Sequence, residues 1–217
     1  MFLKIGYWGH FSSIVKADNI NKVEYFVFEK DKCPNKLLNY VKKNDCKYYF
    51  IESKSDMWRI LRKNVIPDLT IVGNFGFIFT KKMIELLKRR IINIHPGELP
   101  EYRGKHPLPQ AILNGEEEMG ITAHVLNEKI DFGCIIEKEK LKINYDESYK
   151  YNENRIFELV PDIFDNLINK FKKNKIKFKN QEMREGTYYE PLERNQLEKI
   201  TNCNKLRRIN NNGKISN

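Results

Sequence analysis

The sequence contains few cysteines, and none of them belongs to a C-x-x-C pair or to another spacing typical of metal ligands. The four thiols are scattered along the chain at Cys33, Cys46, Cys134 and Cys203. Zinc sites and disulfide frameworks need paired or regularly spaced cysteines, so the sequence argues against both. Isolated reduced thiols fit a reducing compartment.

Long apolar runs are also missing. No stretch approaches the roughly 20 apolar residues that a membrane-spanning helix needs. The first nine residues, MFLKIGYWG, are interrupted too early for a signal peptide and predict a strand over residues 2–7 instead. We therefore expect a cytoplasmic protein that makes no membrane contact. A chain of 217 residues can hold one α/β domain with a sizeable core.

The turn after this first strand lacks the glycine pattern of a dinucleotide site. Such a site needs G-x-G-x-x-G directly after the strand, whereas residues 6–13 read GYWGHFSS. A nicotinamide cofactor is therefore not expected. Trp8 and His10 lie in this turn, where they could line a substrate site or could simply pack against the core.

The formal net charge of +10 has two interpretations. A concentrated basic patch would indicate a nucleic-acid or polyanion partner. The lysines occur singly or in pairs along the whole chain, which favours solvated faces and predicts no nucleic-acid partner. A basic rim would still attract a small anionic substrate such as a nucleotide diphosphate.

Strands and helices alternate in the first part of the chain. This alternation predicts a parallel sheet with crossover helices on both faces. The later segment 146–173 has helical spacing, and Pro161 should kink or divide it. We find no internal repeats. The expected strands are 23–28, 48–51, 69–73, 91–95, 120–126 and 134–143, and the expected helices are 34–44, 55–63 (capped by Ser53 or Ser55), 80–88 and 108–114.

Two polar residues interrupt the apolar strand 91–95. Side chains alternate along a strand, so Asn93 and His95 should share one face while Ile92 and Ile94 pack on the other. Open α/β sheets bind ligands at the carboxyl ends of their strands. From the strand alone, a ligand-facing pair and a hydrogen-bonded pair within the core both stay open.

Three runs extend this pattern: N-x-H-P-G-x-L-P-x-Y-R-G at 93–104, G-x-T-x-H at 120–124 and D-x-G at 131–133. With them, residues 68–143 closely resemble the formyltransferase family that uses N10-formyltetrahydrofolate. The resemblance implies a Rossmann-like, mostly parallel sheet, N10-formyltetrahydrofolate as formyl donor and no metal. It also implies that Asn93, His95 and Asp131 form the catalytic set.

These three side chains suit acyl transfer to an amine. Asn93 is the candidate donor to the developing oxyanion, an interaction typically contributing about 3 to 4 kcal/mol. His95 is the candidate base, because an unperturbed imidazole titrates near neutral pH. Asp131 would orient His95, raise its basicity or hold a proton-relaying water, and the sequence leaves these roles open.

The resemblance also implies folate contacts on two segments. One is the turn after strand 69–73, with Phe75, Gly76, Phe77 and Ile78; its alternative is an ordinary turn with buried aromatics. The other precedes Asp131 and comprises Asn127, Glu128, Lys129 and Ile130.

Further residues are candidates for contacting the acceptor. Arg103 either anchors its loop or contacts substrate, and His124 is expected to support the site rather than react. Tyr188 and Tyr189 would stack on a nucleotide base or simply pack. The full set of candidate acceptor contacts is Trp8, His10, Tyr102, Arg103, Lys105, His106, Tyr188 and Tyr189.

Three branches of the family differ in their acceptor. Initiator methionyl-tRNA formyltransferases carry an additional C-terminal domain, and only about 40 residues follow the long helix here. Glycinamide ribonucleotide formyltransferases carry a phosphate loop that residues 6–13 lack. Sugar N-formyltransferases carry a loop like residues 96–104, so we expect a nucleotide-linked, dTDP-type deoxyamino sugar as acceptor, in bacterial surface polysaccharide synthesis. A non-catalytic basic α/β binding protein is the alternative from another class.

The chain is expected to divide at residue 173. Residues 1–173 would form the catalytic domain, and 174–217 a short extension that joins the substrate site or a homodimer contact. Within the extension only 186–191 looks ordered, and 205–217 is predicted to be a loose tail.

Overall fold

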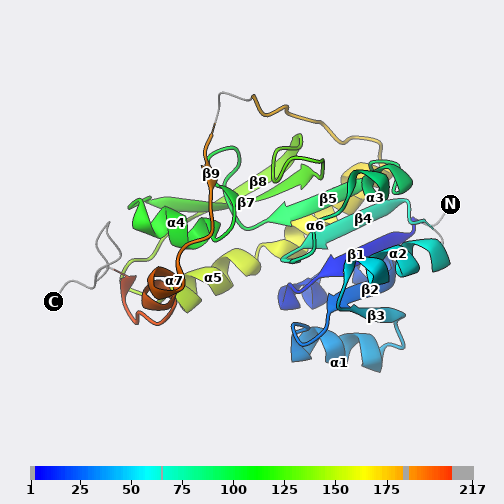
Figure 1. Cartoon of the computed structure of the whole chain (residues 1–217), viewed down its shortest axis with the longest axis horizontal. Coiled ribbons are helices and arrows are strands. Elements are labelled where there is room, and N and C mark those ends of the chain that lie inside the picture. The colour runs from blue at the N-terminus through cyan, green and yellow to red at the C-terminus, as the bar shows by residue number, and fades with distance from the viewer. Residues whose placement is uncertain (1–2, 65, 183–185, 207–217) are drawn as a thin grey trace.

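A seven-stranded sheet with the order β3-β2-β1-β4-β5-β7-β8 forms the centre of the computed structural model, which describes residues 3–64, 66–182 and 186–206 (Figure 1). The first five strands in this order are mutually parallel, and β7 and β8 run antiparallel to their neighbours. The predicted mostly parallel α/β sheet is therefore confirmed. The strands are β1 (Ile5–Gly9), β2 (Val23–Glu29), β3 (Tyr48–Ile51), β4 (Leu69–Gly73), β5 (Ile91–His95), β7 (Glu118–Val125) and β8 (Ile135–Lys142).

Helices cover both faces of the sheet, as the alternating pattern predicts. Each face has its own apolar cluster, and successive strand residues such as Phe26 and Val27 pack into opposite clusters. Among the described residues, no helix has both the length and the apolar character needed to span a membrane. The helices are the 3-10 turns η1 (Ser12–Lys16) and η2 (Ile20–Lys22), then α1 (Asn35–Lys43), α2 (Lys54–Lys63), α3 (Lys81–Leu86), α4 (Pro107–Leu113), α5 (Tyr149–Phe157), α6 (Val160–Lys172) and α7 (Arg194–Thr201).

Local signals set several of these boundaries. Ser53 caps α2 by accepting a hydrogen bond from the Asp56 backbone, and the Asp56 side chain accepts one from the Ser53 backbone N–H. Pro161 lies in the first turn of α6, where a missing N–H costs least, so it divides the predicted segment 146–173 into α5 and α6. The first strand begins at Ile5 rather than at residue 2, which lies outside the described residues.

A second, two-stranded sheet joins the C-terminal segment to the loop that follows β5. It consists of β6 (Arg103–Gly104) and β9 (Tyr188–Tyr189), which pair in parallel. In Figure 1, β9 descends past the sheet toward α7, which lies beside α4 and α5.

The extension is more ordered than its polar composition indicates. It contains α7, and the side chains of Ile200 and Leu206 are fully buried in the larger apolar cluster. The prediction of a loose tail is therefore wrong for Leu206, whose backbone N–H also donates to the Glu147 carbonyl oxygen. The rest of that tail, residues 207–217, lies outside the described residues.

Candidate active site

The carboxyl end of β5 positions the first two predicted catalytic side chains. Ile92 and Ile94 pack into the larger apolar cluster, so Asn93 and His95 share the opposite face. Strand β7 lies antiparallel beside β5 and places His124 directly opposite Asn93. His95 is buried, with 5% of its surface exposed.

Asp131 reaches this pair from the loop between β7 and β8. Its Oδ1 accepts a hydrogen bond from Asn93 Nδ2 at 3.3 Å, and its Oδ2 accepts one from the Gly104 backbone at 3.1 Å. The carboxylate also lies 3.6 Å from His95 Nδ1 and 3.4 Å from His124 Nε2. The structure thus brings Asn93, His95 and Asp131 into one cluster, in which His95 is buried and Asn93 and Asp131 are partly exposed.

One nitrogen of His95 is committed to the backbone. Its Nε2 lies 2.7 Å from the carbonyl oxygen of Tyr102. Since a carbonyl can only accept, Nε2 carries the hydrogen, and the unprotonated Nδ1 of a neutral ring faces Asp131. Burial lowers the pKa of His95 despite the opposing effects of Asp131 and the Tyr102 carbonyl. The imidazole is therefore neutral near pH 7 and able to accept a proton at Nδ1.

Asp131 remains ionised in this buried position. Burial alone raises the pKa of its carboxyl group, but the electrostatic influence of His95 and His124, together with the hydrogen bond from the Gly104 backbone, outweighs burial and holds the pKa well below its usual range. Nδ1 of His95 and Oδ2 of Asp131 are thus two acceptors that face each other. This arrangement suits a proton-bearing nitrogen or a water bound between them.

His124 orients the Asn93 amide. Nδ1 of His124 donates to the carbonyl oxygen of Val125 at 3.0 Å, which leaves Nε2 to accept from Asn93 Nδ2 at 3.2 Å. Both amide hydrogens of Asn93 are therefore directed, one toward His124 and one toward Asp131. The expected supporting role of His124 agrees with this geometry.

Thr122 holds the turn that follows β5. Its hydroxyl donates to the Gly97 carbonyl at 2.8 Å and accepts from the Leu99 backbone at 3.1 Å. The motif G-x-T-x-H contains Thr122, but the motif alone does not predict that its hydroxyl holds this turn. The pattern that indicates a role in the site is its position two residues before His124 on β7, because side chains two residues apart on a strand point to the same face.

The loop between β5 and α4 is packed against the C-terminal segment. The guanidinium of Arg103 is buried, donates through Nε to Gln181 at 2.9 Å and lies 4.3 Å above the Phe132 ring. The Tyr102 ring stacks on Tyr189 at a centroid distance of 5.3 Å. Arg103, Tyr102 and Tyr189 therefore hold the β5–α4 loop against the rest of the protein.

The remaining acceptor candidates of this region are more accessible. Tyr188 is 46% exposed, and Lys105 is also exposed. His106 is partly buried at the start of α4, where its Nδ1 accepts from the Leu192 backbone at 3.2 Å. Burial, with the neighbouring Lys105, lowers the pKa of His106.

Trp8 and His10 lie deeper than the predicted substrate contact requires. The Trp8 indole is fully buried and packs edge-on against Phe75 at 5.8 Å, so it offers no surface to an acceptor. His10 is 7% exposed and lies 3.2 Å from Glu29, whose carboxylate accepts from the Gly76 backbone at 2.6 Å. Both residues support the turn after β4, because strand β1 directs them into the core beneath it.

The two predicted folate segments lie near each other at the ends of β4 and β7. Lys81, just after the first segment, lies 3.5 Å from the Glu128 carboxylate in the second. Ile78 is 58% exposed and Ile130 is 46% exposed. In the first segment Gly76 and Ile78 are exposed and Phe75 and Phe77 are partly buried, and in the second Asn127, Glu128, Lys129 and Ile130 are all exposed.

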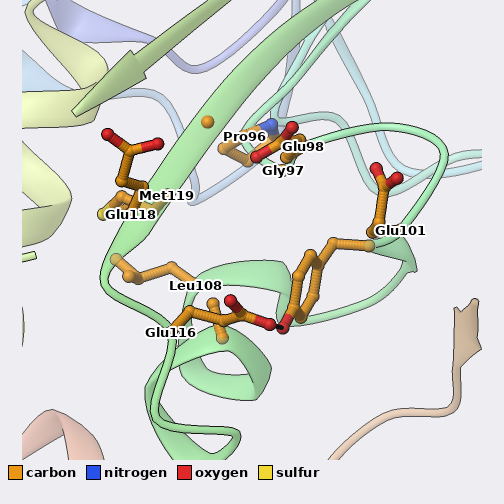
Figure 2. Close-up of a pocket in the computed structure, with 11 residues that line it drawn as sticks. Pro96, Gly97, Glu98, Glu101, Leu108, Glu116, Glu118 and Met119 are labelled. Atoms are coloured by element: carbon orange, nitrogen blue, oxygen red, sulfur yellow. Dashed lines mark hydrogen bonds between the residues drawn. The ribbon is translucent and has the colours of Figure 1, made fainter. Parts of the chain in front are cut away.

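An acidic cavity of about 190 Å³ borders the loop between β5 and α4 (Figure 2). Four glutamates surround it, of which Glu98 pairs with Lys138 and Lys140 and Glu116 accepts from the Tyr102 hydroxyl. Asn93, His95 and Asp131 are not among the described residues that line it. The cavity is therefore separate from the catalytic cluster.

Similar sequences occur among methionyl-tRNA formyltransferases. The chain is 30% identical over 145 residues to the methionyl-tRNA formyltransferase of Thermotoga maritima, covering 67% of this chain and 46% of that protein. The match to the Thermotoga neapolitana enzyme covers 58% of this chain and 40% of that protein, at 32% identity. The chain thus spans less than half the length of these curated relatives.

Solved structures share the fold at lower sequence identity. The sugar 3N-formyl transferase WlaRD, solved in the presence of dTDP and 5-N-formyl-THF, superposes with a TM-score of 0.70 at 22% identity, covering 87% of this chain and 70% of that chain. Phosphoribosylglycinamide formyltransferase from Anaplasma phagocytophilum superposes with a TM-score of 0.72 at 18% identity, covering 88% of this chain and 100% of that chain. The sequence model of the formyl transferase family matches residues 22–168, more than half of the chain. The protein therefore belongs to the formyl transferase family.

Proposed function

We propose that the protein transfers a formyl group from N10-formyltetrahydrofolate to a primary amine. The observation that carries this proposal is the cluster in which Asn93 Nδ2 bonds to Asp131 at 3.3 Å and His95 Nδ1 lies 3.6 Å from the same carboxylate. An amide donor, a neutral imidazole and an ionised carboxylate are the groups that acyl transfer to an amine requires.

The reaction assigns one task to each group. The amine nitrogen attacks the formyl carbon, and the formyl oxygen becomes an oxyanion that accepts a hydrogen bond from Asn93. This donor exchanges one of its present partners for the oxyanion, and such a bond contributes about 3 to 4 kcal/mol. His95 Nδ1 takes the proton that the amine loses, and the positive charge of the resulting imidazolium is stabilised by Asp131. The bond from carbon to N10 of the folate then breaks, and the proton passes to N10.

The folate donor is assigned to the two adjoining turns. The segments 75–78 and 127–130 lie at the carboxyl ends of β4 and β7, on either side of the Lys81–Glu128 pair. Exposed Ile78 and Ile130 offer apolar surface to a flat ring, and the exposed backbone of Gly76 allows close approach. This placement brings a formyl group bound there toward Asn93.

For the acceptor we propose a nucleotide-linked deoxyamino sugar of the dTDP type. The exposed ring of Tyr188 lies over Gly104, the residue whose N–H binds Asp131, so a base stacked on Tyr188 would place its sugar near the cluster. Structural neighbours that support this class include WlaRD and the Helicobacter canadensis N-formyltransferase in complex with folinic acid and dTDP-3-aminofucose. A homodimer and a role in surface polysaccharide synthesis belong to the same proposal.

A second acceptor is initiator methionyl-tRNA. The identity of 30% over 145 residues to a methionyl-tRNA formyltransferase favours it, as does the net charge of +10. A tRNA acceptor would bind with a steep dependence on salt, because each neutralised phosphate releases counterions. A nucleotide diphosphate carries far fewer charges and would show a shallow dependence.

The test is formyl transfer from N10-formyltetrahydrofolate to a panel of amines. The panel contains dTDP- and UDP-linked amino sugars, glycinamide ribonucleotide and initiator methionyl-tRNA. We expect turnover of a dTDP-amino sugar, and a loss of about 10²- to 10⁴-fold in His95→Ala, the range for removal of a positioned base. Turnover of tRNA or glycinamide ribonucleotide alone would overturn the sugar assignment. Folate binding without transfer to any amine would support the non-catalytic binding protein instead.

A further inference from the structure

Gln181 is a buried polar residue of the C-terminal segment that contacts the Asp131 loop. It is 8% exposed and lies beyond residues 22–168, the part of the chain that matches the family. We propose that Gln181 is a positioning residue that holds the Asp131 carboxylate in place for formyl transfer. This inference rests on the proposed function, and the geometry of one carboxamide carries it.

The amide nitrogen of Gln181 binds both ends of the Asp131 turn. Its Nε2 donates to the Asp131 carbonyl at 3.1 Å and to the Gly133 carbonyl at 2.7 Å. Asp131 adopts a left-handed backbone conformation with φ of 52°. This conformation costs a non-glycine residue about 1 kcal/mol or more and persists where its surroundings hold it. The two bonds from Gln181 supply that support.

The amide oxygen of Gln181 is fixed by Arg103. Its Oε1 accepts from Arg103 Nε at 2.9 Å, so the carboxamide cannot rotate without facing its oxygen toward two carbonyl oxygens. The Arg103 guanidinium also lies over Phe132, within the same turn. The next residue, Gly104, donates to the Asp131 carboxylate. Gln181 thus links the backbone of Asp131 to the strand that binds its side chain.

The position of Gln181 itself is set from both sides. Before it, Lys179 exchanges two backbone hydrogen bonds of 2.8 Å with Ile135 at the start of β8. After it, β9 pairs with β6, and the Arg103 N–H donates to the Thr187 carbonyl at 3.0 Å. The side chain of Gln181 therefore lies between the β7–β8 loop, which carries Asp131, and the loop after β5, which carries Arg103.

The test compares Gln181→Met with Gln110→Met in the full-length protein. Methionine keeps the volume of glutamine and removes its hydrogen bonds. Gln110 is a matched control, because it is also 8% exposed and also binds the C-terminal segment, but it donates to the Glu190 carbonyl at 3.3 Å rather than to the Asp131 turn. A second variant, Gln181→Leu, also removes the hydrogen bonds of the carboxamide and adds no charge, so an effect that both variants share belongs to the lost bonds rather than to the methionine side chain.

Two readouts distinguish positioning from simple packing. We expect both Gln181 variants to lower kcat by about 10- to 100-fold with little change in the KM for folate, the range for losing a residue that orients a reacting group. We also expect the imidazole of His95, followed by NMR titration, to protonate at lower pH than in the wild type. Asp131 and His124 are the titratable groups that influence its pKa, and a displaced Asp131 attracts the proton less. Gln110→Met should change neither readout.

The titration needs no substrate, so it stays decisive even when the proposed function fails. A wild type that transfers no formyl group would refute formyl transfer, while a shifted His95 titration in the Gln181 variants would still support the link to Asp131. Folded Gln181 variants with the wild-type titration of His95 and kcat within about twofold of the wild type would overturn the proposal.

Discussion

Asp131 is the residue on which the hydrogen bonds of the candidate site converge. Asn93, His95, His124 and Gly104 all lie within 3.6 Å of its two carboxylate oxygens. These neighbours hold its pKa well below the usual range even though burial opposes them. The charge that the site needs for catalysis is therefore also a charge that the folded state stabilises.

This charge predicts how Asp131→Asn changes the pH dependence of stability. A carboxyl group whose pKa is lower in the folded state contributes stability above its unfolded pKa, about 3.9, and that contribution is lost as the pH falls toward the folded pKa. Each unit of lowering corresponds to about 1.4 kcal/mol. The stability that the Asp131 carboxylate gives the wild type over Asp131→Asn should thus shrink as the pH falls from about 4 toward about 3, below the unfolded pKa. Denaturant unfolding across this range measures it.

The comparison isolates Asp131 from other carboxylates. The pKa values of Glu29 and Asp56 are also lowered, but both residues are present in the two proteins and their contributions cancel. An advantage that stays constant between about pH 4 and about pH 3 would contradict the prediction.

At the scale of single residues, the sequence indicates the facing of side chains only where a periodic element sets it. The alternation of β5 places Asn93 and His95 on one face, as predicted. Trp8 and His10 stand at the end of a strand, and both are buried because Phe75 and Glu29 pack against them, contacts that no local pattern encodes. Gln181 contacts Arg103 across 78 positions of the chain, and no local pattern encodes such a contact.

Among the elements, the β6–β9 pair fixes the loop that carries the site. Gly104 in β6 has a φ of 96°, which favours glycine, and a Cβ built on it would lie 2.2 Å from the Tyr189 carbonyl oxygen. The Tyr189 carbonyl therefore occupies the space that the side chain of any other residue at position 104 would need. Glycine is required at this position both for its conformation and for this close approach.

Gly104→Ala should accordingly separate β9 from β6. We expect it to lower the free energy of unfolding by more than the roughly 1 to 2 kcal/mol of a left-handed residue, and to lower kcat, because the Gly104 N–H to Asp131 bond is displaced. Gly115→Ala is the matched control: it has a φ of 71° on an exposed turn, so it carries the conformational cost alone. Denaturant unfolding of both variants checks the difference, and equal losses would contradict it.

Elements with a clear apolar pattern follow their sequence predictions more closely than the two-residue strands do. The strands over 48–51, 69–73 and 91–95 match their predicted bounds, because each is a short apolar run between turn signals. Strands β6 and β9 have two residues each, too few for any periodicity. The sequence does not predict helix α7, because its buried side is small, with Ile200 as its buried residue.

For the molecule as a whole, the extension and the catalytic part share one core. Ile200 and Leu206 belong to the same apolar cluster as β1, β5 and α6. Gln181 and β9 add polar links to the loops of the site. We therefore propose that residues 174–206 fold together with residues 1–173, and that the boundary at 173 separates two parts of one cooperative unit.

The prediction that tests this unit is the cost of Ile200→Ala. Ile200 is fully buried, and truncating a buried isoleucine costs about 2 to 5 kcal/mol, since it removes apolar contact and leaves a cavity. Ile78→Ala is the matched control for stability: that side chain is 58% exposed, and surface changes stay within about 0.5 kcal/mol. If the chain is one unit, Ile200→Ala lowers the midpoint of a single unfolding transition that intrinsic fluorescence and circular dichroism both follow. An early transition confined to the extension, with the main midpoint unchanged, would show instead that residues after 173 unfold on their own.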